Sequence, residues 1–132
     1  MIDPIWIEEK TVLEIHVRLL GLYGGASGVR DVNLLKSALA RPLQHFAYAD
    51  NPDIIDLAAT LTVGIVRNHP FVDGNKRTGF LAGMIFLELN GYDFIATREV
   101  STQTVLALAA GEIDESAYAE FLRQSTTPSR QT

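Results

Sequence analysis

Apolar residues recur every three or four positions in the first quarter of the chain. Over residues 8–22 they form a single stripe, made of Val12, Ile15, Leu19 and Leu22. This spacing predicts an amphipathic helix, and Gly24 and Gly25 end it because glycine favours turns. Asp31 precedes a second apolar stripe and predicts the start of another helix. We expect that helix to end near Pro42.

The segment after Pro42 has no helical period. Aromatic and smaller residues alternate within residues 43–52, most clearly at Phe46, Ala47 and Tyr48. Alternation with a period of two is typical of extended backbone. We therefore expect a short flap, extended or hairpin-like, between the second and third helices.

Two later segments are apolar around most of their circumference, which is typical of buried helices. The first starts at Asp53 and ends near His69, since Pro70 disfavours helical geometry in the residue before it. The second runs from about Asn75 to a stop at Asn90.

Two shorter helices follow, the first capped by Ser101 or Thr102 and the second by Asp114. The polar tail, residues 126–132, is expected to be disordered. The pattern predicts an all-α fold: a single domain over residues 1–125, built as a compact bundle of about six helices.

Composition and charge exclude several classes of protein. The 132 residues contain no cysteine, so disulfides and thiolate metal sites are absent. Eleven basic residues against 16 acidic ones give a net charge of −5, whereas nucleic-acid binders are basic. No run approaches the ~18 apolar residues of a membrane span, and no signal peptide is evident. We expect a cytoplasmic protein with no direct DNA, RNA or membrane partner.

Polar residues separate the two buried helices, and these are His69, Asp73, Asn75, Lys76 and Arg77. Burying such groups is costly unless they are paired or bind a ligand. A helix that begins near Asn75 leaves its first N–H groups free for an anion. Lys76 and Arg77 place positive charge where it opposes the helix dipole. A bound phosphate would remove that conflict.

The same loop carries groups for chemistry. Asp73 offers a hard oxygen ligand for Mg²⁺, which binds few carboxylates together with substrate phosphates. His69 can accept a proton near neutral pH. Taken singly, His69 could be structural, Asp73 part of an ordinary turn and Lys76 a solvated cation. Together they are the groups needed to transfer phosphorus from a nucleotide, although the glycines of a Walker loop are missing before Lys76.

The segment HPFVDGNKR, residues 69–77, is similar to the signature H-P-F-x-[DE]-G-N-x-R of the Fic/Doc superfamily. A second block, residues 24–42, resembles the Doc ("death on curing") branch, and the resemblance extends over residues 8–122. It implies the helical Fic/Doc fold, with His69 as the base for an acceptor hydroxyl and Asp73 as a ligand of Mg²⁺ or a contact of the acceptor. The residues that would hold phosphates are Gly74, Asn75, Lys76 and Arg77, with Arg77 also counted as catalytic.

The resemblance implies two further roles. Phe71 would anchor the loop in the core. The flap, including Phe46, Ala47 and Tyr48, would align an extended target peptide by edge pairing.

Two positions distinguish this chain from Fic enzymes that transfer AMP. Those enzymes usually have glycine in place of Lys76 and a second arginine in place of Phe80. Both differences match the Doc branch, whose members phosphorylate a threonine of elongation factor Tu and block translation. The lysine is thought to reverse the nucleotide so that its γ-phosphate meets the acceptor. The resemblance thus implies a kinase that uses ATP and Mg²⁺. AMP transfer and a non-catalytic binding or regulatory module are the alternatives.

Regulation is expected to come from a partner. Many Fic proteins carry an inhibitory helix, [ST]-x-x-x-E-[GN], and residues 116–121 depart from it at Phe121. Glu120 is therefore expected to be a surface residue. The resemblance implies a small antitoxin whose disordered tail folds on binding.

Four other residues are assigned structural positions. We expect His16 to pack against its own helix and His45 to lie in the flap, neither being catalytic. Arg30 and Asp31 are expected to form an ion pair, with Asp31 also capping a helix.

Overall fold

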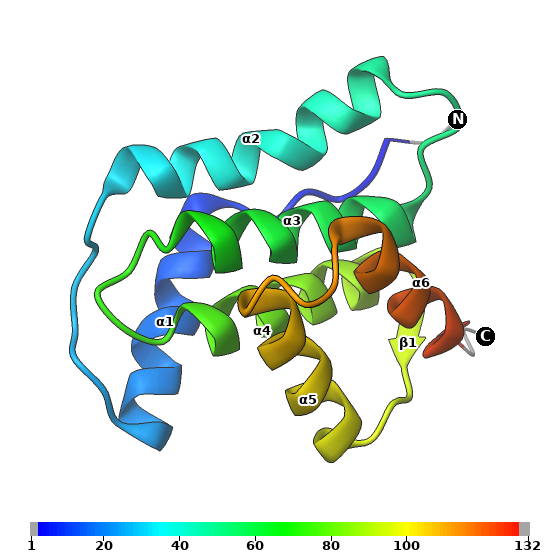
Figure 1. Ribbon diagram of the computed structural model, residues 1–132. Helices are drawn as coiled ribbons and strands as arrows, with labels where there is room; N and C mark the ends of the chain where they lie inside the picture. The colour runs from blue at the N-terminus through cyan, green and yellow to red at the C-terminus, as the bar shows by residue number, and fades with distance from the viewer. Residues whose placement is uncertain (1–2, 130–132) are drawn as a thin grey trace.

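The computed structural model describes residues 3–129, which form six helices and one two-stranded sheet. The elements are α1 (Glu9–Tyr23), α2 (Val32–Tyr48), α3 (Ile54–Asn68), α4 (Asn75–Leu89), β1 (Tyr92–Phe94), α5 (Arg98–Ala109), α6 (Glu115–Gln124) and β2 (Thr126–Pro128). Figure 1 shows α3 in the middle of the molecule, with α2 lying along one side of it. The predicted all-α fold is confirmed. None of the helices over residues 3–129 is both long enough and apolar enough to span a bilayer.

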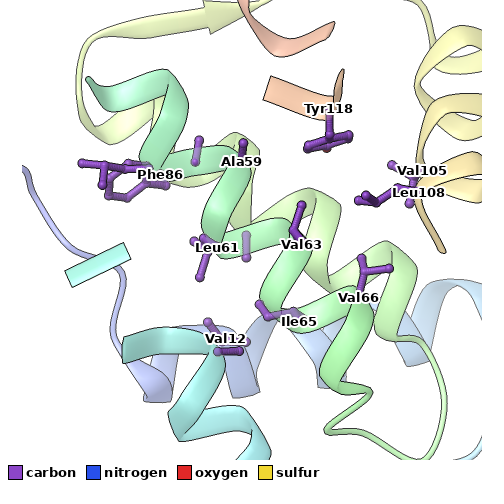
Figure 2. Close-up of a cluster of buried hydrophobic side chains, with 14 of the residues drawn as sticks. Val12, Ala59, Leu61, Val63, Ile65, Val66, Phe86, Val105, Leu108 and Tyr118 are labelled. Atoms are coloured by element: carbon purple, nitrogen blue, oxygen red, sulfur yellow. The ribbon is translucent and has the colours of Figure 1, made fainter. Parts of the chain in front are cut away.

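Helix α3 is the centre of the core. Every residue from Leu57 to Val66 is buried, so the helix contacts neighbours around its whole circumference. Figure 2 shows Val12 of α1 on one side of it and Tyr118 of α6 on the other. Burial of each large apolar side chain contributes roughly 1.5–3 kcal/mol, and this central helix is the one that the apolar pattern predicted.

Glycines bring α4 directly against α3. A Cβ on Gly79 would lie 3.0 Å from Cγ2 of Val66, and a Cβ on Gly83 would overlap Oγ1 of Thr62. The Thr62 hydroxyl donates a hydrogen bond of 2.7 Å to the carbonyl of Gly79. The two helices that flank the polar loop are therefore fixed backbone against backbone.

Helix α2 continues through Pro42, where it was predicted to end. A proline inside a helix costs about 3 kcal/mol because its N–H is missing and its ring crowds the preceding turn. Pro42 is buried, however, and it extends the buried stripe that begins with Leu35 and Ala38. Burial of that stripe against α3 outweighs the local cost.

The predicted flap is helical over its first half. Phe46, Ala47 and Tyr48 belong to the last turn of α2. Phe46 packs edge-on against Trp6, with ring centroids 5.6 Å apart, while Tyr48 is 88% exposed. The alternation of aromatic residues thus comes from a helix with one buried side. The prediction of an extended flap is wrong for these residues.

The C-terminal part differs from the prediction in two places. Helix α5 begins at Arg98, and its cap is Thr97, whose hydroxyl accepts from the N–H of Val100 at 3.3 Å; the predicted caps Ser101 and Thr102 lie inside the helix. The segment Thr126–Pro128 forms β2, which pairs antiparallel with β1, so the prediction of a disordered tail is wrong there. Residues 130–132 of that tail lie outside the described residues.

Candidate active site

The polar loop between α3 and α4 begins with a strained residue. His69 has φ 54° and ψ 54°, the left-handed conformation, which costs an L-residue of this kind on the order of 1–3 kcal/mol. Arg30 compensates by donating from Nε to the carbonyl of His69 at 2.7 Å and from Nη2 to that of Asn68 at 3.0 Å. Arg30 is therefore the C-terminal cap of α3 and not the ion-pair partner of Asp31, which caps α2 as predicted.

The loop is also paired with the segment that enters α2. The backbone N–H groups of Arg30 and Asp31 both donate to the carbonyl of Pro70, at 2.7 and 3.0 Å. Phe71 forms an isolated antiparallel bridge with Val29. These bonds hold the start of the loop in one position although it contains no regular secondary structure.

Asn75 closes the loop from inside. Its amide oxygen accepts from the N–H of Phe71 and its amide nitrogen donates to the carbonyl of Phe71, both at 2.9 Å. Phe71 is fully buried, as an anchor of the loop in the core would be, and Asn75 is 4% exposed. Because both ends of the Asn75 amide are engaged, its part in the predicted phosphate cradle would come from its backbone N–H.

His16 supports the loop from α1. Its ring stacks on Phe71 with centroids 3.8 Å apart, and its Nε2 lies 2.8 Å from the carbonyl oxygen of Asp73. A carbonyl only accepts, so Nε2 carries the proton. His16 was predicted to pack against its own helix, but its ring contacts the loop instead. The signal that could have revealed its position is its place one residue after Ile15 and four after Val12, on the buried side of α1.

Asp73 presents an ionised carboxylate to solvent. Hydrogen bonds from the N–H groups of Gly74, at 2.8 Å, and Ala26, at 3.3 Å, lower the pKa of Asp73, with smaller contributions from the charges of Lys76 and Arg77. Each oxygen retains a lone pair for a metal. Mg²⁺ suits one carboxylate when phosphates and water supply its other ligands. Within residues 3–129 no three acidic or histidine side chains gather into a metal site, so a metal here would depend on the nucleotide.

The start of α4 is open to an anion. Gly74, at φ 81°, precedes the helix and provides no side-chain cap. The first backbone N–H groups of α4 therefore face the loop without a capping side chain, as an anion site requires. Lys76 and Arg77 are exposed beside them, and the ion pairs found among residues 3–129 engage other cations.

The structure brings most of the predicted site together at one end of α3. The exposed members are His69, Asp73, Lys76 and Arg77, on one loop and the following helical turn. Phe46, Ala47 and Tyr48 lie elsewhere. Asn68 of α3 contacts Leu34 near the start of α2, so the two helices run in opposite directions (Figure 1). The end of α2 therefore lies beside the start of α3. A helix of 15 residues is about 20 Å long, and this length separates the end of α2 from the loop. The predicted flap does not border the site.

Comparison with known proteins shows the family to which the chain belongs. The model of the Fic/DOC family matches residues 6–87. "Protein kinase doc" of Escherichia phage P1 is 32% identical over 118 residues, which cover 89% of this chain and 93% of that protein. "Toxin Doc" of Mycolicibacterium smegmatis is 43% identical over 79 residues, covering 59% of this chain and 61% of that protein.

The chain belongs to the Fic/DOC family. The resemblance on which the site residues were assigned is thereby confirmed. Two relatives that carry the name Doc agree with the branch that Lys76 and Phe80 indicated.

Proposed function

We propose that this chain is a Doc-type toxin that transfers the γ-phosphate of ATP to a serine or threonine hydroxyl of a translation factor such as elongation factor Tu. The observation that carries the proposal is the convergence of His69, Asp73 and the uncapped start of α4 on one rigid loop. These are a base, a magnesium ligand and an anion site, which phosphoryl transfer requires side by side.

In the proposed reaction, His69 accepts the proton of the acceptor hydroxyl. The hydroxyl oxygen then forms a bond to the γ-phosphorus, and the bond from that phosphorus to the β–γ bridging oxygen breaks, so that ADP leaves. Asp73 would hold Mg²⁺, whose charge compensates that of the phosphates. Lys76, Arg77 and the N–H groups at the start of α4 would hold the phosphate chain.

A kinase is favoured over an AMP transferase by Lys76. A lysine side chain cannot occupy the space in which a glycine backbone would touch phosphate, so the nucleotide must sit differently. The relative called a protein kinase is similar along 89% of this chain, which supports the same choice. AMP transfer stays the second candidate because Pro70 and Gly74 follow the wider Fic pattern.

The position of the label in transferred product separates the two reactions. The purified protein is incubated with Mg²⁺, candidate translation factors and ATP labelled at the α- or γ-phosphate. We expect γ-label alone on the target, and a mass gain of one phosphate. Transfer of α-label, with a mass gain of one AMP, would show that the protein is an AMP transferase and not a kinase.

Variants connect this activity to the site. We expect His69→Ala to abolish transfer and growth inhibition. His45 lies in α2, near the end of α3 that is opposite the loop, and His45→Gln should retain both. Growth inhibition that survives in His69→Ala would favour the non-catalytic binding module. Lys76→Gly is expected to weaken phosphate transfer, and undiminished kinase activity in that variant would remove the argument from Lys76.

The toxin function also suggests a partner and a location. Both named relatives are Doc proteins, and we propose a small antitoxin whose disordered tail folds on this chain. A translation factor as target would place the protein in the cytoplasm. Co-purification with the product of the neighbouring gene, and loss of growth inhibition on co-expression, would test the partner.

A further inference from the structure

Three helices meet at Tyr23, the last residue of α1. The guanidinium carbon of Arg77, in the first turn of α4, lies 4.5 Å from the centre of the Tyr23 ring. Arg98, the first residue of α5, places Nη2 3.5 Å from the hydroxyl of Tyr23. A single phenol ring therefore stands between two guanidinium groups, one of which belongs to the candidate active site.

Asp73 lies close enough to Arg77 for the two charges to interact, and this interaction helps to lower the pKa of Asp73. The ion pairs formed within residues 3–129 engage Lys36, Arg41 and Arg123, and neither Arg77 nor Arg98 takes part in one. Both guanidinium groups contact the same ring, and like charges repel. Stacking of Arg77 on an exposed aromatic ring returns only about 0.5–1 kcal/mol. An anion placed between the two guanidinium groups would lower the energy of both.

The contacts leave the arginines free to bind such an anion. Tyr23 is 49% exposed and Arg77 is also exposed, so the guanidinium that stacks on the ring is still open to solvent. The contact of Arg98 with the Tyr23 hydroxyl is at the long end of the hydrogen-bond range. Arg98 can therefore exchange this neutral acceptor for a phosphate oxygen, to which a charge-assisted bond is stronger.

We propose that Arg98 contacts the phosphate chain of the nucleotide bound at the start of α4, and that Tyr23 is the positioning residue that holds Arg77 and Arg98 around it. This inference rests on the proposed nucleotide site. It assigns to Arg98 a role in specificity: a second guanidinium strengthens the binding of ATP more than that of AMP, because a triphosphate offers more charged oxygens within its reach.

A purely structural role for Arg98 makes a different prediction. Arg98 is the first residue of α5, where a positive charge opposes the helix dipole. If Arg98 serves to bind phosphate, replacement by glutamine should therefore leave the protein at least as stable as before. If Arg98 instead stabilised the fold through Tyr23, the glutamine variant would unfold at lower denaturant concentration.

The test is calorimetric titration with ATP and AMP in the presence of Mg²⁺. We expect Arg98→Gln to weaken ATP binding about fivefold to tenfold and to leave AMP binding within about twofold. Tyr23→Phe keeps the ring under Arg77 and should have a smaller effect than Tyr23→Leu, which releases both arginines. Arg18→Gln removes the same charge from the exposed side of α1 and should leave both affinities unchanged.

Two results would overturn the inference: equal ATP affinity in Arg98→Gln and the parent protein, or equal weakening of ATP and AMP. Absence of any nucleotide binding by the parent protein would also overturn it. A selective loss of ATP affinity without transfer of γ-label would sustain Arg98 as a phosphate contact and reject the kinase. Normal transfer of γ-label with unchanged ATP affinity in Arg98→Gln would sustain the kinase and reject Arg98 as a phosphate contact.

Discussion

The imidazole of His16 lies parallel to the ring of Phe71, with the two centroids 3.8 Å apart and the planes inclined by 10°. The same imidazole donates to the carbonyl of Asp73. A side chain from α1 thus fixes both the buried anchor of the loop and the backbone of its exposed carboxylate. Because His16 is only 3% exposed, we expect it to position Asp73 and not to contact a substrate.

Replacement of His16 by phenylalanine should separate these two contacts. His16→Phe retains an aromatic ring against Phe71 but leaves the carbonyl of Asp73 without its donor. We expect a loss of about 1–3 kcal/mol in the free energy of unfolding and a larger proportional loss of transfer activity, measured by urea denaturation and with labelled ATP. Full activity in a folded His16→Phe protein would contradict the positioning role.

Asn75→Asp should destabilise the loop. A carboxylate at this position cannot donate to the carbonyl of Phe71, and it would bring a charge into a site that is 4% exposed. We expect a loss of about 2 kcal/mol or more in the free energy of unfolding. Differential scanning calorimetry at neutral pH measures it. An unchanged melting temperature would show that the reciprocal bonds to Phe71 do not hold the loop.

Asp53 should make the stability of the fold depend on pH in the acidic range. Partial burial acts to raise the pKa of Asp53, but the hydrogen bond from the N–H of Asp56 and the pairing with Arg123 outweigh it, so the pKa is lowered overall. A lowered pKa in the folded state stabilises the fold above the unfolded value of about 3.9, and that contribution disappears as the pH falls through the lower, folded pKa.

Asp53→Asn tests this dependence because asparagine caps a helix as well as aspartate but does not titrate. The stability advantage of the parent protein over Asp53→Asn should be constant near neutral pH and shrink below about pH 4. Urea unfolding at several pH values measures the difference. If the difference in stability between the two proteins stays the same down to pH 2, titration of Asp53 does not cause the pH dependence.

Two glycine-to-alanine changes should have opposite effects. In Gly83→Ala the new Cβ overlaps Oγ1 of Thr62, whereas in Gly21→Ala it meets nothing within 4 Å. We expect Gly83→Ala to cost about 1–3 kcal/mol and Gly21→Ala to add about 0.5–1 kcal/mol through helix propensity. Denaturant unfolding of both variants provides the comparison. Equal effects would mean that close packing of α4 on α3 does not limit the residue at 83.

The features that the sequence predicted well depend on local signals. The side chains of Asp31, Asp53 and Asp114 cap the helices that they were expected to begin. The continuous apolar run of α3 identified it as the central helix. In these cases a residue and its near neighbours in the chain determine the structure, and no distant contact opposes them.

The features that were missed depend on contacts between distant residues. Pro42 is locally unfavourable in a helix, and only burial against α3 reveals why it stays there. The partner of His16 is the carbonyl of a residue 57 positions away. Arg30 bonds to Asn68 and His69 and not to its neighbour Asp31. The spacing of residues along the chain does not predict these pairings, because they depend on how the helices pack.

The contact of Gly79 and Gly83 with α3 also fixes the span that the polar loop has to bridge. Neither helix can slide along the other to absorb an inserted or deleted residue, because a side chain in the place of either glycine would meet α3. The number of residues from His69 to Asn75 is therefore constrained as strictly as their chemistry. A new substrate preference at this site would have to arise by exchange of side chains, because a change in loop length would alter the position of His69, the proposed base, relative to the start of α4.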